Sequence, residues 1–160
     1  MIYGTVGTMH KDFARFIRAL DEFAKQTDEE VVIQTGLDST VPEHADHFDF
    51  RSRDEVLELQ RNARVIVTHA GIGSVIDALQ CGISLIVVPR LKRYGEHNND
   101  HQLDLARAVE RRGWGKLLLD TADLPDALAS PPPPYTDYVP AKKPLLEAVR
   151  AATLRAAESR

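Results

Sequence analysis

A glycine-rich turn between two apolar strands constrains this chain more than any other feature. Residues 63–68 (ARVIVT) form a short β-branched run, which is typical of a parallel strand covered on both faces. The turn HAGIGS at 69–74 leads into an apolar helix that extends to about Cys81, and a second apolar strand follows at 84–89. This order of strand, helix and strand predicts a right-handed crossover in a parallel α/β sheet.

The turn also has the composition of an anion-binding site. Gly71 and Gly73 permit positive φ angles and close approach of a ligand, while Ser74 can cap the helix or donate to an anion. The N–H groups of the first helical turn and the helix dipole favour negative charge, so a diphosphate is the natural ligand. His69 could donate to the same phosphates. Asp77, one turn after Ser74, could accept hydrogen bonds from both ribose hydroxyls.

A polar cluster, GEHNNDHQ at 95–102, follows the second strand. Because loops at the carboxyl ends of parallel strands meet at one edge of a sheet, this cluster is expected beside the glycine turn. A metal site is one alternative, since His97 and His101 would lie one helical turn apart; the segment is not H-E-x-x-H, and no third ligand is evident. A solvated helix start with Asp100 in its first turn is another alternative. Ligand binding is the favoured interpretation.

The rest of the chain continues the alternation of strands and helices. Four to six parallel strands are expected. The strands are predicted at 2–6, 31–34, 48–50, 63–68, 84–89 and 116–119, and further helices at 12–26, 54–62 and 98–111. Composition changes at residues 130–134, which hold four consecutive prolines and favour an extended strap. We therefore predict a domain at 1–129, a proline-rich strap at 130–143, and an amphipathic helix at 144–160 that packs on the domain or on a partner.

Composition excludes several classes of protein. The net charge of −4 argues against a general nucleic-acid-binding protein. The single cysteine rules out an internal disulfide. No signal peptide or long apolar segment is evident, so a cytoplasmic location is expected.

Three segments together resemble a known family. HAGIGS followed by the acid at 77, GISLIVVPR at 82–90 and GEHNNDHQ at 95–102 are similar to the C-terminal domain of glycosyltransferase family 28. The likeness extends from the first strand to about Leu119. It is greatest to the stand-alone subunits of split transferases, in bacterial exopolysaccharide synthesis and in the dolichol pathway. The resemblance implies that residues 1–129 form a Rossmann-like nucleotide-sugar-binding domain, equivalent to the C-terminal half of a GT-B glycosyltransferase.

The resemblance also assigns roles to residues. His69, Gly73 and Ser74 would hold the diphosphate, Asp77 the ribose, and Asp100 with Gln102 the sugar hydroxyls. Many relatives have glutamate where this chain has Asp77, and their glycine-rich first loop corresponds to residues 4–8 (GTVGT). The complete predicted donor-binding set is Gly7, Thr8, His69, Gly71, Gly73, Ser74, Asp77, Arg90, Glu96, His97, Asp100 and Gln102. An anionic donor sugar would need a cation, for which Arg90, Lys92 and Arg93 are candidates.

The function that the resemblance implies is that of half an enzyme. The chain would bind the UDP-sugar as the catalytic subunit of an inverting, two-component hexosyltransferase that needs no metal or other cofactor. A membrane-anchored partner would supply the N-terminal half and the site for a polyprenyl-diphosphate-linked sugar acceptor, and would hold this chain at the inner face of the membrane. The pathway would be exopolysaccharide or lipid-linked oligosaccharide synthesis. No catalytic base is identifiable in the sequence.

Two alternatives belong to other classes of protein. A non-catalytic nucleotide-binding regulatory or scaffold module would keep the phosphate turn but would have no use for Asp100 and Gln102. A nicotinamide-dependent dehydrogenase would need a third glycine in the turn, and Ile76 occupies that place.

Overall fold

A computed structural model describes residues 1–37 and 39–139 of the chain. Within them lies one six-stranded sheet in the order β3-β2-β1-β4-β5-β6, in which every neighbouring pair is parallel. This arrangement confirms the predicted parallel α/β sheet. The strands are β1 (Ile2–Thr5), β2 (Val31–Gln34), β3 (Asp46–Phe48), β4 (Val65–Thr68), β5 (Ser84–Val87) and β6 (Lys116–Leu117).

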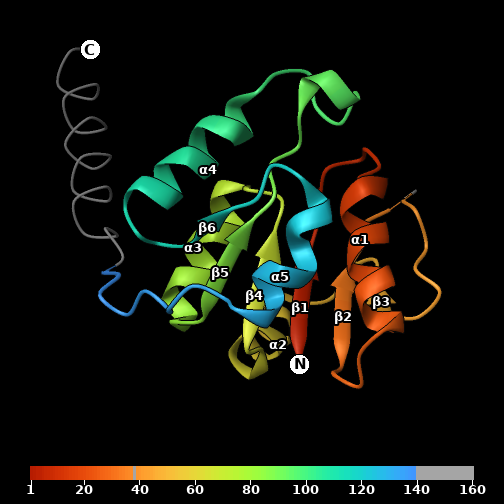
Figure 1. Ribbon diagram of the computed structural model, residues 1–160, viewed down its shortest axis with the longest axis horizontal. Coiled ribbons are helices and arrows are strands. Elements are labelled where there is room, and N and C mark those ends of the chain that lie inside the picture. Colours follow the sequence, from red (N-terminus) through yellow and green to blue (C-terminus); the bar gives the residue numbers. More distant parts are fainter. Residues whose placement is uncertain (38, 140–160) are drawn as a thin grey trace, which may run out of the picture.

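Helices cover both faces of the sheet (Figure 1). They are α1 (Ala14–Lys25), α2 (Arg53–Asn62), α3 (Ile72–Cys81), α4 (His101–Arg111) and α5 (Leu124–Ala129), with short 3-10 helices at Lys92–Tyr94 and Thr121–Asp123. Helices α1 and α5 share one face, whereas α2, α3 and α4 pack on the other. In the described part of the chain no helix has the length and apolar character needed to cross a membrane.

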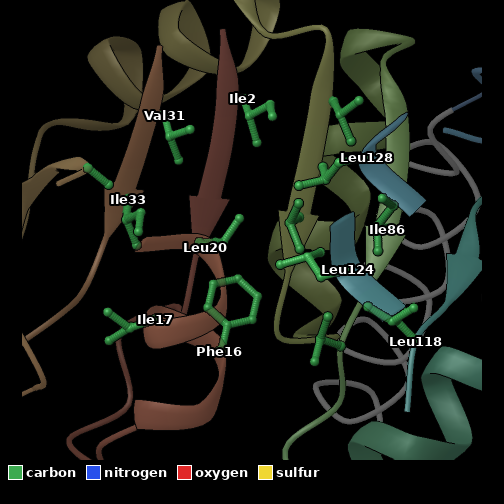
Figure 2. Close-up of a cluster of buried hydrophobic side chains, with 14 of the residues drawn as sticks. Ile2, Phe16, Ile17, Leu20, Val31, Ile33, Ile86, Leu118, Leu124 and Leu128 are labelled. Atoms are coloured by element: carbon green, nitrogen blue, oxygen red, sulfur yellow. The ribbon is translucent and has the colours of Figure 1, made fainter. Parts of the chain in front are cut away.

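Alternating strand residues divide the interior into two cores. Figure 2 shows the core beneath α1 and α5, where Phe16, Leu20 and Leu124 point toward strand residues such as Ile33 and Ile86. Each buried side chain of this size contributes roughly 1.5–3 kcal/mol relative to exposure. Strands β1, β2, β4 and β5 are buried at every position, which is why their sequences are nearly continuous apolar runs. The two cores fix the strand ends that carry the site.

Some elements differ from the sequence-based expectations. The short strand predicted at 48–50 lies at Asp46–Phe48, and the helix predicted from 98 begins at His101, with Asp100 at its N-cap. Helix α5 was not predicted, because its six residues begin with a proline in the first turn and are too few to show helical periodicity.

The described part of the proline-rich segment packs on the face of the sheet that α4 covers. Ser84 Oγ donates to the Pro132 carbonyl at 2.7 Å, and the rings of Tyr135 and Tyr138 lie 6.2 and 6.1 Å from that of Trp114. Residues 130–139 form no helix or strand. The remainder of the predicted strap and the helix predicted at 144–160 lie outside the described residues, so the proposed division of the chain stays a prediction.

Candidate functional site

A pocket of about 400 Å³ opens at the carboxyl ends of the central strands. It lies beside the point where the strand order reverses, since β1 is flanked by β2 on one side and β4 on the other. Open α/β sheets bind ligands in the crevice at such a point. The lining residues are Thr5, Gly7, Thr8, Gln34, Phe50, Arg51, Arg53, Val56, Gln60, His69, Gly71, Gly73, Ser74 and Asp77. Seven of the twelve predicted donor-binding residues are therefore brought together.

The N-terminus of α3 forms one wall of this pocket. The helix follows Gly71, and no side chain of the described residues caps its first N–H groups, which have no partner within a helix. A Cβ atom added at Gly73 would meet no atom within 4 Å, so packing within the protein does not require glycine there. Open space beside unpaired N–H groups and a serine hydroxyl suits an anion.

Two other glycines are required by the ring of His69. A Cβ atom at Gly7 would lie 2.5 Å from His69 Cε1, and one at Gly71 would collide with His69 Nε2. Gly7 also has a φ of 76°, which disfavours other residues. Neither Gly71 nor Gly73 adopts the positive φ that glycine permits; the positive φ in this turn, 62°, belongs to Ala70. Glycine is needed at 71 for space, because the histidine ring lies against it.

His69 is buried and neutral in this position. Its Nδ1 lies 3.3 Å from the Thr5 carbonyl oxygen, which favours the tautomer with the proton on Nδ1. Burial, followed by the charge of Arg90, lowers the pKa of His69 from 6.5 to about 4. In that tautomer Nε2 is an acceptor. The predicted donation from Nε2 to a phosphate therefore requires that His69 take up a second proton when the anion binds.

Asp77 is engaged in an ion pair at the edge of the pocket. Its Oδ1 accepts from Arg53 Nη2 at 2.6 Å. Arg53 is the first residue of α2, whose start is fixed by a capping box between Ser52 and Glu55. Neither Arg53 nor the adjacent Arg51 was predicted as a site residue. The only sequence signal was Ser52 near a helix start, and it does not indicate that the helix faces the glycine turn.

Gln34, at the end of β2, was also missed by the sequence analysis. The Thr5 hydroxyl accepts from the Gly7 N–H at 3.1 Å, so its own proton is donated to Gln34 Oε1 at 2.8 Å. Tyr3 also donates to Gln34 Oε1, at 3.2 Å, and burial raises the pKa of that tyrosine. The side-chain hydrogen bonds of Gln34 within the described residues use Oε1, which leaves the Nε2 amide donor for a ligand in a residue that lines the pocket.

The other predicted residues lie in the loop after β5 or, for Gln102, in the first turn of α4, and they do not line this pocket. The Arg90 side chain is fully buried and donates to the carbonyls of Val6, Lys11 and Asp12, while its guanidinium lies over the Phe13 ring. Lys92 and Arg93, the other cations considered for an anionic sugar, are exposed.

Polar groups in this part of the chain are bonded to N–H groups nearby or to α1. Glu96 is buried, pairs with Arg15 at 2.9 Å and accepts from the Leu91 N–H. Asp100 accepts from the Lys92 N–H, and Gln102 from the Arg90 N–H. His97 Nδ1 accepts from the Asn99 N–H at 3.2 Å. The roles predicted for these residues in donor binding stay predictions.

Further hollows have different chemistry. One of about 530 Å³ beside β6 is lined by four carboxylates and one lysine, which disfavours a phosphate. Within residues 1–37 and 39–139, no three His, Cys, Asp or Glu side chains are grouped so as to hold a metal ion.

Comparisons with known proteins identify the family of the chain. Residues 1–130 match the model of the glycosyltransferase family 28 C-terminal domain. The chain is 30% identical over 121 residues to the human UDP-N-acetylglucosamine transferase subunit ALG13, covering 70% of this chain and 10% of that protein. It is 29% identical over 119 residues to the NDP-glycosyltransferase YjiC of Bacillus licheniformis, covering 71% and 28%. The chain thus spans less than a third of the length of either relative.

Solved structures show the same fold. The calicheamicin glycosyltransferase CalG4 matches with a TM-score of 0.62 and 20% identity over 80% of this chain and 33% of that one. The solution structure of ALG13 matches with a TM-score of 0.55 and 15% identity over 84% of this chain and 87% of that one. These likenesses confirm the predicted Rossmann-like fold of a GT-B C-terminal half. With the family match over residues 1–130, they establish that the chain belongs to the glycosyltransferase family 28 C-terminal domain family.

Proposed function

We propose that this chain is the UDP-sugar-binding half of a glycosyltransferase whose acceptor half is a separate subunit. The observation that carries the proposal is the uncapped start of α3, where Gly73 faces open space and Ser74 lines a pocket at the sheet's switch point. The diphosphate would bind at this helix start, and the ribose hydroxyls would donate to Asp77.

The same groups would assist the departure of the nucleotide. Sugar transfer places negative charge on the leaving diphosphate, and preorganised N–H donors aimed at that charge lower the barrier. Ser74 and the N–H groups of the first turn of α3 would supply them without a metal or other cofactor. His69 would take up a proton as the charge develops, because the anion favours its charged form.

The acceptor hydroxyl would attack the anomeric carbon from the face opposite the nucleotide, which inverts the configuration of a hexose. A general base must take its proton. We assign that base to the partner. Among the side chains that line the described pocket, the carboxylate of Asp77 is paired with Arg53, and the buried His69 is bonded to the Thr5 carbonyl.

The nucleotide base would lie on the other side of the pocket. The ring of Phe50 lines the pocket and is 46% exposed, which offers a face for stacking. The free amide N–H groups of Gln34 Nε2 would donate to an oxygen of the nucleotide.

Exposed apolar side chains support the existence of a partner. Among the described residues, large exposed apolar side chains follow the carboxyl ends of β2, β3, β4, β5 and β6, and a seventh lies in the proline-rich segment. The six at the sheet edge are Leu37, Val41, Phe50, Ile72, Tyr94 and Leu119. Apolar residues gathered on one edge mark an interaction surface. We propose that a membrane-anchored acceptor subunit covers this edge, holds the chain at the inner face of the membrane and presents a polyprenyl-diphosphate-linked sugar, as exopolysaccharide or lipid-linked oligosaccharide synthesis requires.

A second candidate function is a non-catalytic nucleotide-binding module. The internal bonding of Asp100 and Gln102 favours it, because these side chains are not free to meet a sugar in this structure. The two candidates differ in whether the sugar of a UDP-sugar adds to the affinity for UDP.

Calorimetric titration of the full chain with UDP, a UDP-sugar and NAD tests the proposal. We expect UDP to bind and NAD not to bind. Ser74→Ala should lower the affinity for UDP about tenfold, as expected for loss of a hydrogen bond to a charged group. Ser130→Ala, on an exposed residue remote from the pocket, is the control. Absence of UDP binding by the folded chain, or equal binding by Ser74→Ala, would contradict the donor site. A UDP-sugar that binds no more tightly than UDP would favour the non-catalytic module.

A further inference from the structure

The charges that line the pocket do not yet match those of a nucleoside diphosphate. A diphosphate ester carries at least two negative charges, and the ionised groups that line the pocket are Arg51, Arg53 and Asp77. His69 is neutral, since burial holds its pKa near 4. The two arginines are therefore the cations available for the ligand, and one of them is already paired with the carboxylate.

The two arginines are held in different ways. The guanidinium of Arg51 lies 4.5 Å from the centre of the Phe48 ring and forms no ion pair within the described residues. Arg53 instead donates to Asp77 Oδ1. This hydrogen bond joins α2 to α3 at the edge of the pocket. If Asp77 accepts hydrogen bonds from ribose, Arg53 has to leave that position or share it.

We propose that Arg53 exchanges partners when the nucleotide binds. It moves from Asp77 to the diphosphate and leaves the carboxylate free to accept from the ribose hydroxyls, while Arg51 remains the fixed cation. This inference rests on the proposed function, because it requires a nucleoside diphosphate in this pocket. It adds Arg53 and Arg51 to the donor-binding residues and makes Arg53 the one that recognises phosphate in particular.

The position of Arg53 allows the exchange. Its side chain is 67% exposed, whereas that of Asp77 is 15% exposed, so the arginine is the mobile member of the pair. Asp77 is largely covered and needs a partner, so when Arg53 forms a charge-assisted bond to a phosphate, the ribose hydroxyls take its place at the carboxylate. The capping box of Ser52 and Glu55 fixes the backbone at the start of α2. The guanidinium can therefore change partner by rotation of its own side chain.

The exchange predicts opposite effects on two ligands. For UDP, removal of the Arg53 charge deletes a phosphate contact and weakens binding. For uridine, which has no phosphate, the same change removes a competitor for Asp77, so binding is unchanged or tighter. Asp77→Asn should weaken the binding of both UDP and uridine, because it alters the carboxylate that accepts from the ribose of each ligand. A purely structural role for the ion pair would affect both ligands alike.

The test compares wild type, Arg53→Gln and Arg61→Gln as full chains. Arg61 is an exposed cation on the same helix, does not line the pocket, and is a matched control for net charge. UDP affinity is measured by calorimetry at low and high salt, and weak uridine binding by protein-detected NMR titration. Thermal melting checks that each variant is folded.

We expect Arg53→Gln to bind UDP about tenfold more weakly at low salt, to lose part of the salt dependence, and to bind uridine at least as well as wild type. Arg61→Gln should resemble wild type. Equal weakening of UDP and uridine by Arg53→Gln, or no change in either, overturns the exchange alone. A wild-type chain that binds no UDP overturns the proposed function and the exchange with it.

Discussion

The two halves of the carboxyl edge of this sheet handle their polar groups differently. In the glycine half, formed by Gly7 and residues 69–77, backbone N–H groups, Ser74 and the space beside Gly73 are open to the pocket. In the β5 loop, residues 88–102, the carboxylates and amides instead bond to N–H groups of the same loop or to neighbouring elements. The first half offers unpaired donors to a ligand, although Asp77 within it is paired with Arg53, and the second is arranged to hold its own shape.

This difference shows what a cluster of polar residues does and does not indicate. Buried polar groups must be paired, and a loop rich in carboxylates can satisfy its own N–H groups with them. The buried Arg90 guanidinium joins the loops after β1 and β5 through its Nη atoms, and the buried Glu96 carboxylate joins the β5 loop to Arg15 in α1. The β5 loop can still shape the rim on which a sugar would rest, while the open donors for a diphosphate lie in the glycine half.

The largest expected effect is that of Gly7→Ala. The added Cβ would lie 2.5 Å from the His69 ring, at a φ of 76°. We expect a loss of at least about 2 kcal/mol of unfolding free energy, from collision and backbone strain together, and loss of UDP binding. Gly95→Ala in the β5 loop is the matched control, since φ there is 70° and the Cβ meets no atom within 4 Å. Chemical denaturation measures both, and an equal loss in the two variants would contradict the role of the His69 ring.

The pH dependence of stability should report on His69. Its pKa is about 4 in the folded chain and 6.5 without the protein environment, so the unfolded chain binds more protons between these values. Stability contributed by the neutral ring is therefore full above about pH 6.5 and is lost as the pH falls toward 4, by up to about 3 kcal/mol. Denaturation across this range should show a slope that His69→Gln reduces. Bound UDP should also reduce it, because the anion stabilises the protonated ring. An unchanged slope in His69→Gln would assign the effect to other groups.

A change in the β5 loop should separate stability from nucleotide binding. Glu96→Gln weakens the ion pair with Arg15 and the bond from Leu91 N–H, which we expect to cost about 1–3 kcal/mol. UDP affinity should stay within about twofold of wild type, because no atom of this residue lines the pocket. Thermal melting and calorimetry give the two values. If the variant stays folded but loses much of its affinity for UDP, the β5 loop also takes part in nucleotide binding, and the proposed difference between the two halves is wrong.

The smallest change in stability is expected for Gly73→Ala, and it has the opposite sign. Alanine in place of glycine stabilises a helix interior by roughly 0.5–1 kcal/mol, which is the upper limit at this second residue of α3, and nothing among the described residues obstructs the new methyl group. The methyl group would occupy space that we assign to the diphosphate. A chain that melts higher and binds UDP more weakly is the expected combination, and undiminished binding would place the phosphates elsewhere.

The sequence predicted the glycine half because its information is local. A β-branched strand, HAGIGS and an apolar helix are consecutive, so the helix start and Ser74 follow from neighbouring residues alone. The sequence did not show why residue 71 must be glycine, since the packing of the His69 ring against that residue depends on tertiary structure.

The rest of the site could not be read in this way. Gln34 ends β2, Arg51 lies in the loop before α2, and Arg53 begins α2, and no local spacing indicates that they face the glycine turn. In the β5 loop, by contrast, the residue types suggested contacts with a ligand, whereas the structure shows them bonded within the protein. Whether a carboxylate such as Asp100 meets a ligand or the N–H of Lys92 depends on the conformation of the loop, which residue types do not specify.

The most direct test is to map UDP on the assigned amide spectrum of the full chain and then to repeat the titration with a UDP-sugar. We expect UDP to shift the N–H signals of Gly7 and residues 71–74 most, with little effect on residues 91–102, and the sugar to add shifts in that second segment. Largest shifts in residues 91–102 with UDP alone, and an unchanged start of α3, would contradict the assignment of the diphosphate to the glycine half.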